Sequence, residues 1–87
     1  MGRREAAMIF PRYYGDVESF KEYCWWWVDI KQWVDENMPT GWVFKEAYDI
    51  HQDAKAYLVI FRSLIGEGAK KLLFELRDGA LVVSENR

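Results

Sequence analysis

Residues 71–85 read KLLFELRDGALVVSE and give the clearest structural signal in the chain. The dipeptide Asp78-Gly79 suits a two-residue hairpin turn, which needs positive backbone angles. A turn at these residues sets apolar residues of the two strands opposite each other: Leu76 with Leu81, and Phe74 with Val83. The sequence therefore predicts a β-hairpin with one apolar face.

Three further strands are expected upstream of this hairpin. The stretches WVFKEAY (42–48) and AYLVIFR (56–62) read as strands, and the polar stretch between them forms the hairpin loop or its flank. The register of this second pair is ambiguous. Residues 6–13 read as extended, and Pro11 removes one backbone donor, which suits an edge strand or a bulge.

One long helix is expected over about residues 17–37. Asp16 suits an N-cap, and Pro39 disfavours helical backbone at the residue before it. The element order predicts one α+β domain over residues 1–87, with this helix packed across a curved antiparallel sheet of four to five strands. Cystatin-like, monellin-like and small hotdog-like folds share that arrangement, which is an analogy of fold alone and implies no activity.

Four of the five tryptophans fall within residues 24–33, CWWWVDIKQW. At about 100° per residue, one helical stripe is expected to face the core. Its members are Phe20, Tyr23, Trp27, Ile30 and Val34. Trp26 and Trp33 lie on the shoulder of this stripe, whereas Trp25 projects away from it among acidic residues, where a large aromatic side chain is unusual.

One helix is too narrow to cover the predicted sheet. A helix is about 10 Å wide, whereas five strands at about 4.8 Å spacing span roughly 24 Å. Some apolar surface should therefore remain on the second side of the sheet. Sheet curvature and loops could close over it, a small-molecule pocket could use it, or a homodimer could bury it by packing sheet to sheet or edge to edge.

The composition excludes several classes of partner. With 12 Lys and Arg against 14 Asp and Glu, the net charge of -2 lacks the positive field that gathers nucleic acid or anionic lipid. One Cys and one His assemble neither a zinc site nor a disulfide framework.

The apolar run at residues 6–10 is too short for a signal peptide, and no stretch of about 20 apolar residues could span a bilayer. We expect a cytoplasmic protein without metal or cofactor.

Catalysis is not expected, because the sequence shows no identifiable acid, base and nucleophile set. Asp49, His51 and Asp53 alternate as a metal site or a catalytic pair would require, but a polar hairpin loop produces that spacing readily. Cys24 lies beside the predicted buried stripe, and no base for it can be named. These residues are therefore interpreted as a solvated loop and a small core residue.

The leading functional expectation is a small non-enzymatic interaction protein, as a homodimer, of the regulator, inhibitor or immunity-like or antitoxin-like kind. The expected interaction surface is an aromatic patch with an acidic rim that suits a basic protein partner. It comprises Trp25, Trp26, Asp29, Trp33 and Glu36. The alternative is a small-molecule-binding domain or small hotdog-like enzyme with an aromatic-lined pocket. That pocket would use Trp26, Trp33, Trp42, Tyr48 and Tyr57.

Overall fold

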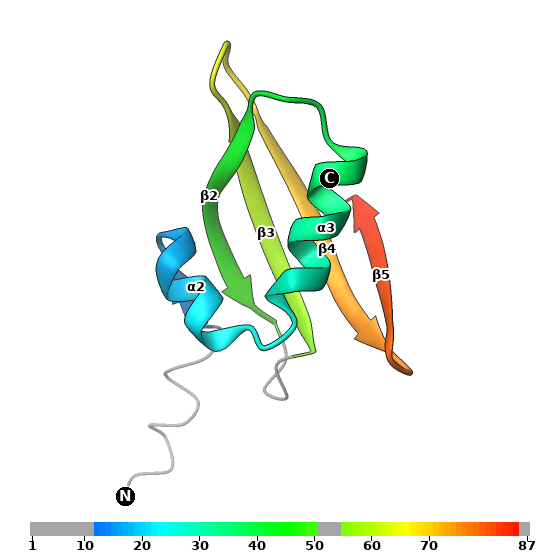
Figure 1. The fold of residues 1–87 in the computed structure, drawn as a ribbon. Coiled ribbons are helices and arrows are strands. Elements are labelled where there is room, and N and C mark those ends of the chain that lie inside the picture. The colour runs from blue at the N-terminus through cyan, green and yellow to red at the C-terminus, as the bar shows by residue number, and fades with distance from the viewer. Residues whose placement is uncertain (1–11, 51–54, 86–87) are drawn as a thin grey trace, which may run out of the picture.

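The computed structural model describes residues 12–50 and 55–85. Two helices pack against one open antiparallel sheet of five strands, in the order β1-β2-β3-β4-β5 (Figure 1). The strands are β1 (Arg12–Tyr14), β2 (Trp42–Asp49), β3 (Ala56–Ser63), β4 (Ala69–Arg77) and β5 (Ala80–Glu85). The helices α2 (Val17–Tyr23) and α3 (Trp27–Asn37) lie between β1 and β2 in the chain. The α+β class is confirmed.

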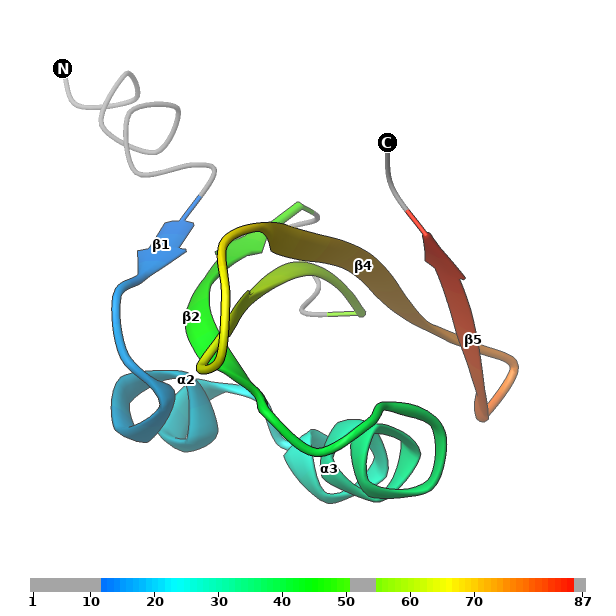
Figure 2. The same cartoon turned by 90° about the horizontal axis from the view of Figure 1, so that it is seen from above.

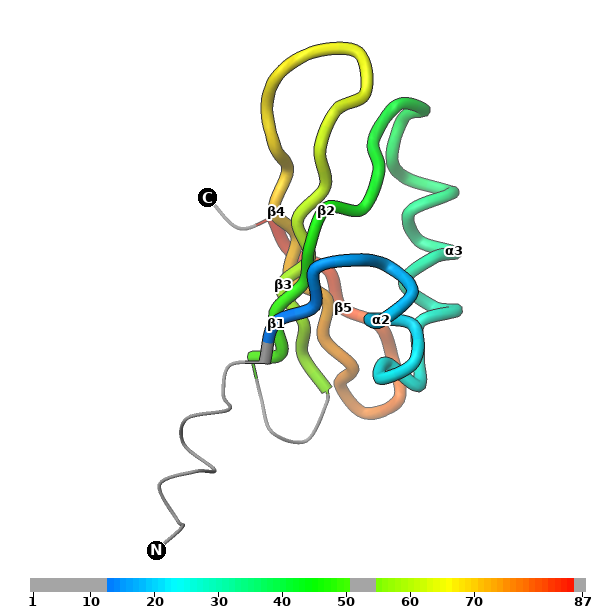
Figure 3. Tube along the Cα trace, turned by 90° about the vertical axis from the view of Figure 1, so that its left-hand side faces the viewer, coloured from blue at the N-terminus to red at the C-terminus, as the bar shows by residue number. Residues whose placement is uncertain are grey.

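Both helices lie on one side of the sheet, which curves around them (Figures 2 and 3). The core fills the space between the helices and this concave face. Its fully buried side chains come from both layers: Phe20 and Ile30 from the helices, and Tyr57, Val59 and Phe74 from the sheet.

The single long helix predicted over residues 17–37 is wrong, although its two ends are placed correctly. The chain leaves helical geometry at Cys24, which has φ -88° and ψ 99°, and α3 begins after Trp26. Tyr, Cys, Trp and Val occupy residues 23–28, and all have low helix propensity, so a break there costs little. The predicted cystatin-like, monellin-like or small hotdog-like arrangement has one long helix, and it is not confirmed.

The break rotates the two helices relative to each other, so the predicted stripe is only partly correct. Phe20 and Ile30 are fully buried, but Tyr23 is 54% exposed. Trp27 and Val34 are half-buried against the core. Cys24 and Trp26, which do not belong to the predicted stripe, are instead buried in the core, at 1% and 2% exposed.

The C-terminal hairpin is confirmed residue by residue. Asp78 and Gly79 have φ of 53° and 80°, so both adopt the left-handed backbone that a tight hairpin turn requires. The predicted pairs are those observed: Leu76 lies opposite Leu81, and Phe74 lies opposite Val83.

The strands β2 and β3 agree with the prediction within one residue, and the structure settles their register. Val59 lies opposite Ala47. The register shifts between Phe44 and Glu46, which marks a β-bulge that the sequence does not predict. The first strand is observed at Arg12–Tyr14. The rest of the predicted strand, residues 6–11, lies outside the described residues.

The convex second face of the sheet carries the side chains that alternate with those of the core. A row of them crosses the sheet through paired positions: Tyr13 with Tyr48, Tyr48 with Leu58, and Leu58 with Leu73. Tyr13 is 55% exposed, and the other three are half-buried. Among the described residues no helix covers this face (Figure 3), but Ala56 and Ile60, which alternate with the core residues of β3, are only 2% and 8% exposed.

Candidate interaction groove

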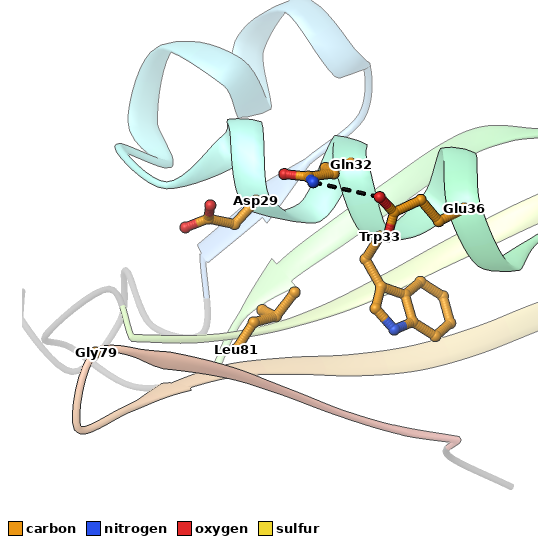
Figure 4. A pocket seen from close by; sticks show the side chains of 6 residues that line it. All are labelled: Asp29, Gln32, Trp33, Glu36, Gly79 and Leu81. Carbon is orange, nitrogen blue, oxygen red and sulfur yellow. Dashed lines mark hydrogen bonds between the residues drawn. The ribbon is translucent and has the colours of Figure 1, made fainter.

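An open groove of about 230 Å³ runs between α3 and the β4–β5 turn. Four residues of α3, spaced by three, four and seven positions, line one side of it: Asp29, Gln32, Trp33 and Glu36. This spacing places all four on one helical face. The opposite side is formed by Gly79 in the turn and Leu81 in β5 (Figure 4).

The apolar part of the groove is anchored in the core. The Trp33 ring meets the Phe74 ring edge to face, with centroids 5.6 Å apart and planes at 83°. Leu81 also packs against the core cluster. Such edge-to-face contacts hold aromatic rings in a defined orientation, so the indole and the leucine form a fixed apolar wall.

The polar part of the groove is acidic. Asp29 and Glu36 contribute two carboxylates, and the Gln32 side-chain amide donates a hydrogen bond to Glu36 Oε2 at 3.3 Å (Figure 4). No Lys or Arg is among the described residues that line it. Lys31, on the same helix, donates instead to Asp35 at 2.8 Å. The groove therefore presents a negative field beside an apolar wall.

The structure brings together three of the five residues predicted for an interaction surface, namely Asp29, Trp33 and Glu36. Trp26 is 2% exposed and lies against Tyr57 with ring centroids 5.5 Å apart, so it belongs to the core. Trp25 is 68% exposed, but it lies outside the groove lining. Val28, three residues further along, is 72% exposed and is also outside the groove lining.

The five aromatics of the alternative pocket do not surround one cavity. Tyr57 and Trp26 are buried in the core, and Trp33 and Trp42 pack around it. Tyr48 follows Ala47, whose side chain is in the core, and its ring pairs with Tyr13 at 5.3 Å on the second face. The sheet therefore separates Tyr48 from the other four.

A small polar cluster on the second face holds these two tyrosines. Tyr13 Oη donates to Glu46 Oε1 at 3.2 Å, and Tyr48 Oη donates to Glu46 Oε2 at 3.5 Å. The hydrogen bond to the carboxylate is the main reason why the pKa of Tyr13 is raised, followed by partial desolvation and the nearby negative charge of Glu46. The cluster ties β1 to β2 at one edge of the sheet.

Sequence reasoning missed Gln32, Gly79 and Leu81. Gln32 lies three residues after Asp29 and four before Glu36, so helical spacing alone could have added it. Gly79 and Leu81 line the groove only because the β4–β5 hairpin turn packs beside α3. That placement follows from packing and has no local sequence signal.

The candidate catalytic features acquire no support from the described residues. Burial raises the pKa of the Cys24 thiol to about 12, which makes it a poor nucleophile. The interpretation of Asp49 as part of a solvated loop is wrong, because this residue ends β2 and is 8% exposed. His51 and Asp53 lie outside the described residues. Within residues 12–50 and 55–85, no three Cys, His, Asp or Glu side chains gather as a metal site requires.

Comparison of the chain with protein-family models, curated proteins and solved structures found no match. In the described part of the chain, neither helix has the length and apolar character needed to cross a membrane.

Proposed function

We propose that the protein is a small non-enzymatic interaction module that holds a basic side chain of a partner protein in the groove beside α3. The observation that carries this proposal is the pairing of two carboxylates, Asp29 and Glu36, with an apolar wall in one groove. A lysine or arginine side chain has the matching construction, because it carries a cation at the end of an apolar stem.

The groove suits such a side chain in both respects. The methylenes can lie along Trp33 and Leu81, while the cation approaches the acidic rim and the indole face. Hydrogen bonds between a cation and a carboxylate are about twice as strong as neutral ones. Because the rim is solvent-exposed, its attraction is screened by salt, and a regulator of this kind would bind in a salt-dependent manner.

The proposal is tested with a short lysine-rich peptide as the probe, followed by NMR through the Trp33 indole and Gln32 amide signals. We expect both signals to shift, and a glutamate-rich peptide of equal length to leave them unchanged. The double variant Asp29→Asn/Glu36→Gln keeps the shape of the groove but removes both charges. It should raise the peptide Kd about tenfold or more, which corresponds to about 1.4 kcal/mol.

The matched control is Glu22→Gln/Glu67→Gln, which removes the same net charge from two exposed positions outside the groove lining. This control should bind the peptide with nearly the wild-type Kd. An equal loss of affinity in both double variants would show that the peptide responds only to net charge, and the groove proposal would then be abandoned.

A further inference from the structure

The two edges of the sheet differ in how they are protected. Edge strands offer unpaired backbone groups to other chains, and proteins normally blunt them with Lys, Pro, bulges or very short strands. At one edge, the described part of the chain contributes three residues, Arg12–Tyr14 of β1. At the other, Ala80–Ser84 contains no Lys or Pro, and its pairing with β4 shows no register shift. The outer edge of β5 is open in the described part of the chain (Figure 2).

The tight turn determines which backbone groups of β5 face outward. In a two-residue hairpin, the residues flanking the turn, here Arg77 and Ala80, form a hydrogen-bonded pair, and such pairs alternate with non-hydrogen-bonded ones along the ladder. Val82 therefore bonds inward to β4. The N–H and C=O groups of Leu81 and Val83 point away from β4, toward the open edge.

We propose that a second copy of this chain pairs with this edge, β5 to β5 and antiparallel, about a two-fold axis at Val82. In this register Leu81 lies opposite Val83 of the second copy, and these residues exchange their outward backbone hydrogen bonds. Ala80 lies opposite Ser84 of the second copy. No charged side chain of Ala80–Ser84 opposes another, so the strand is complementary to itself.

The side chains favour this register, centred on Val82, over a register centred on the next residue, Val83. Leu81 and Val83 both pack on the concave face, so their pairing across the axis continues the apolar layer of the core. A register centred on Val83 would instead set Leu81 against Glu85 of the second copy, placing a carboxylate beside an apolar residue. The sheet of the proposed dimer is continuous across the two copies.

Disulfide trapping tests the register in the full-length chain. At the axis, two Val82 residues form a non-hydrogen-bonded pair with Cα atoms about 4.5 Å apart, which a disulfide can span. Val82→Cys should therefore give a covalent dimer under mild oxidation. In the control Ser84→Cys, the two sulfurs would lie four residues apart along the strands, roughly 13 Å, and should not join. The native Cys24 is buried and does not compete.

Light scattering tests the interface itself. The wild-type chain should have the mass of a dimer at micromolar concentration, and Val82→Lys, which sets two like charges face to face, should raise the dimer Kd about tenfold or more. Val82→Thr should remain dimeric. A monomeric wild-type chain overturns the proposal, and so does a dimer that resists Val82→Lys and is not trapped by Val82→Cys, as a sheet-to-sheet dimer would be.

The proposed dimer and the groove share Leu81, but different variants test them. Asp29→Asn/Glu36→Gln should leave the mass of the dimer unchanged, because neither residue belongs to β5. Val82→Lys should still bind the lysine-rich peptide, because Val82 does not line the groove.

Discussion

Cys24 lies in the break between the two helices, with its backbone N–H donating to Phe20 O at 2.9 Å and its side chain 1% exposed. Because burial raises its pKa to about 12, the thiol stays neutral near neutral pH. We expect it to react with an alkylating reagent far more slowly in the native protein than in denaturant, as measured by mass spectrometry. Equal rates in the two states would contradict the buried position.

The same residue links stability to alkaline pH. Its ordinary pKa of 9.0 applies in the unfolded chain, and its raised pKa of about 12 applies in the folded one. The stabilising contribution is therefore complete below pH 9.0 and is lost as the pH rises toward about 12. Denaturant titrations should show the free energy of unfolding falling across this range, with a shallower fall in Cys24→Ala. Parallel pH profiles for the two proteins would refute this linkage.

Trp25 and Trp26 show what a sequence can say about single residues. The expectation that one aromatic side chain must face away from the core agrees with Trp25, which is 68% exposed. Helical periodicity predicts Trp26 on the shoulder of a continuous helix, yet it is 2% exposed. Its burial depends on the break at Cys24, and helical periodicity cannot be carried across a break.

Some helices and strands have a strong local sequence signal, whereas the bounds of others are determined by packing. The β4–β5 hairpin was predictable because Asp78-Gly79 and two alternating apolar strands all require the same register. The ends of the helical region were predictable from Asp16 and Pro39. The division into α2 and α3 was not, because low helix propensity permits a break without requiring one.

The start of α2 depends on a single side chain. Asp16 Oδ1 accepts a hydrogen bond from the Ser19 N–H at 2.9 Å, which satisfies a donor that the helix cannot satisfy itself. Asp16→Ala should lower the free energy of unfolding by about 1 kcal/mol, as measured by urea denaturation. Asp16→Asn retains an acceptor and should lose much less. If both variants lose the same amount, the cap is not the source of the effect.

At the scale of the whole molecule, Phe20 packs against side chains from most of the helices and strands. Its ring lies within 4.9 to 5.6 Å of four others, measured between centroids. They belong to Tyr14, Trp27, Phe44 and Tyr57. Both helices and the first three strands therefore share one aromatic centre. The sequence predicted that Phe20 is buried but could not identify these neighbours, because they are distant along the chain.

Removing this centre should affect the whole fold. Phe20→Ala is expected to cost about 3–5 kcal/mol, a large part of the roughly 4–13 kcal/mol available to a chain of this length. Thermal unfolding followed by circular dichroism should show a large fall in Tm, with a smaller one for Phe20→Leu. The control Val28→Ala, at a position 72% exposed, should change stability by no more than about 0.5 kcal/mol. A similar Tm for Phe20→Ala and Val28→Ala would contradict the packing described.

Both helices occupy one side of the sheet, and this has a consequence for valency. Strands joined edge to edge about a two-fold axis keep matching faces on the same side, so the proposed pair would present two acidic sites in one direction. A ligand chain with two suitably spaced lysines would then bind the second site intramolecularly, at a high effective concentration. The avidity of this ligand would exceed its affinity for either site alone. This gain in avidity would be absent in the monomer.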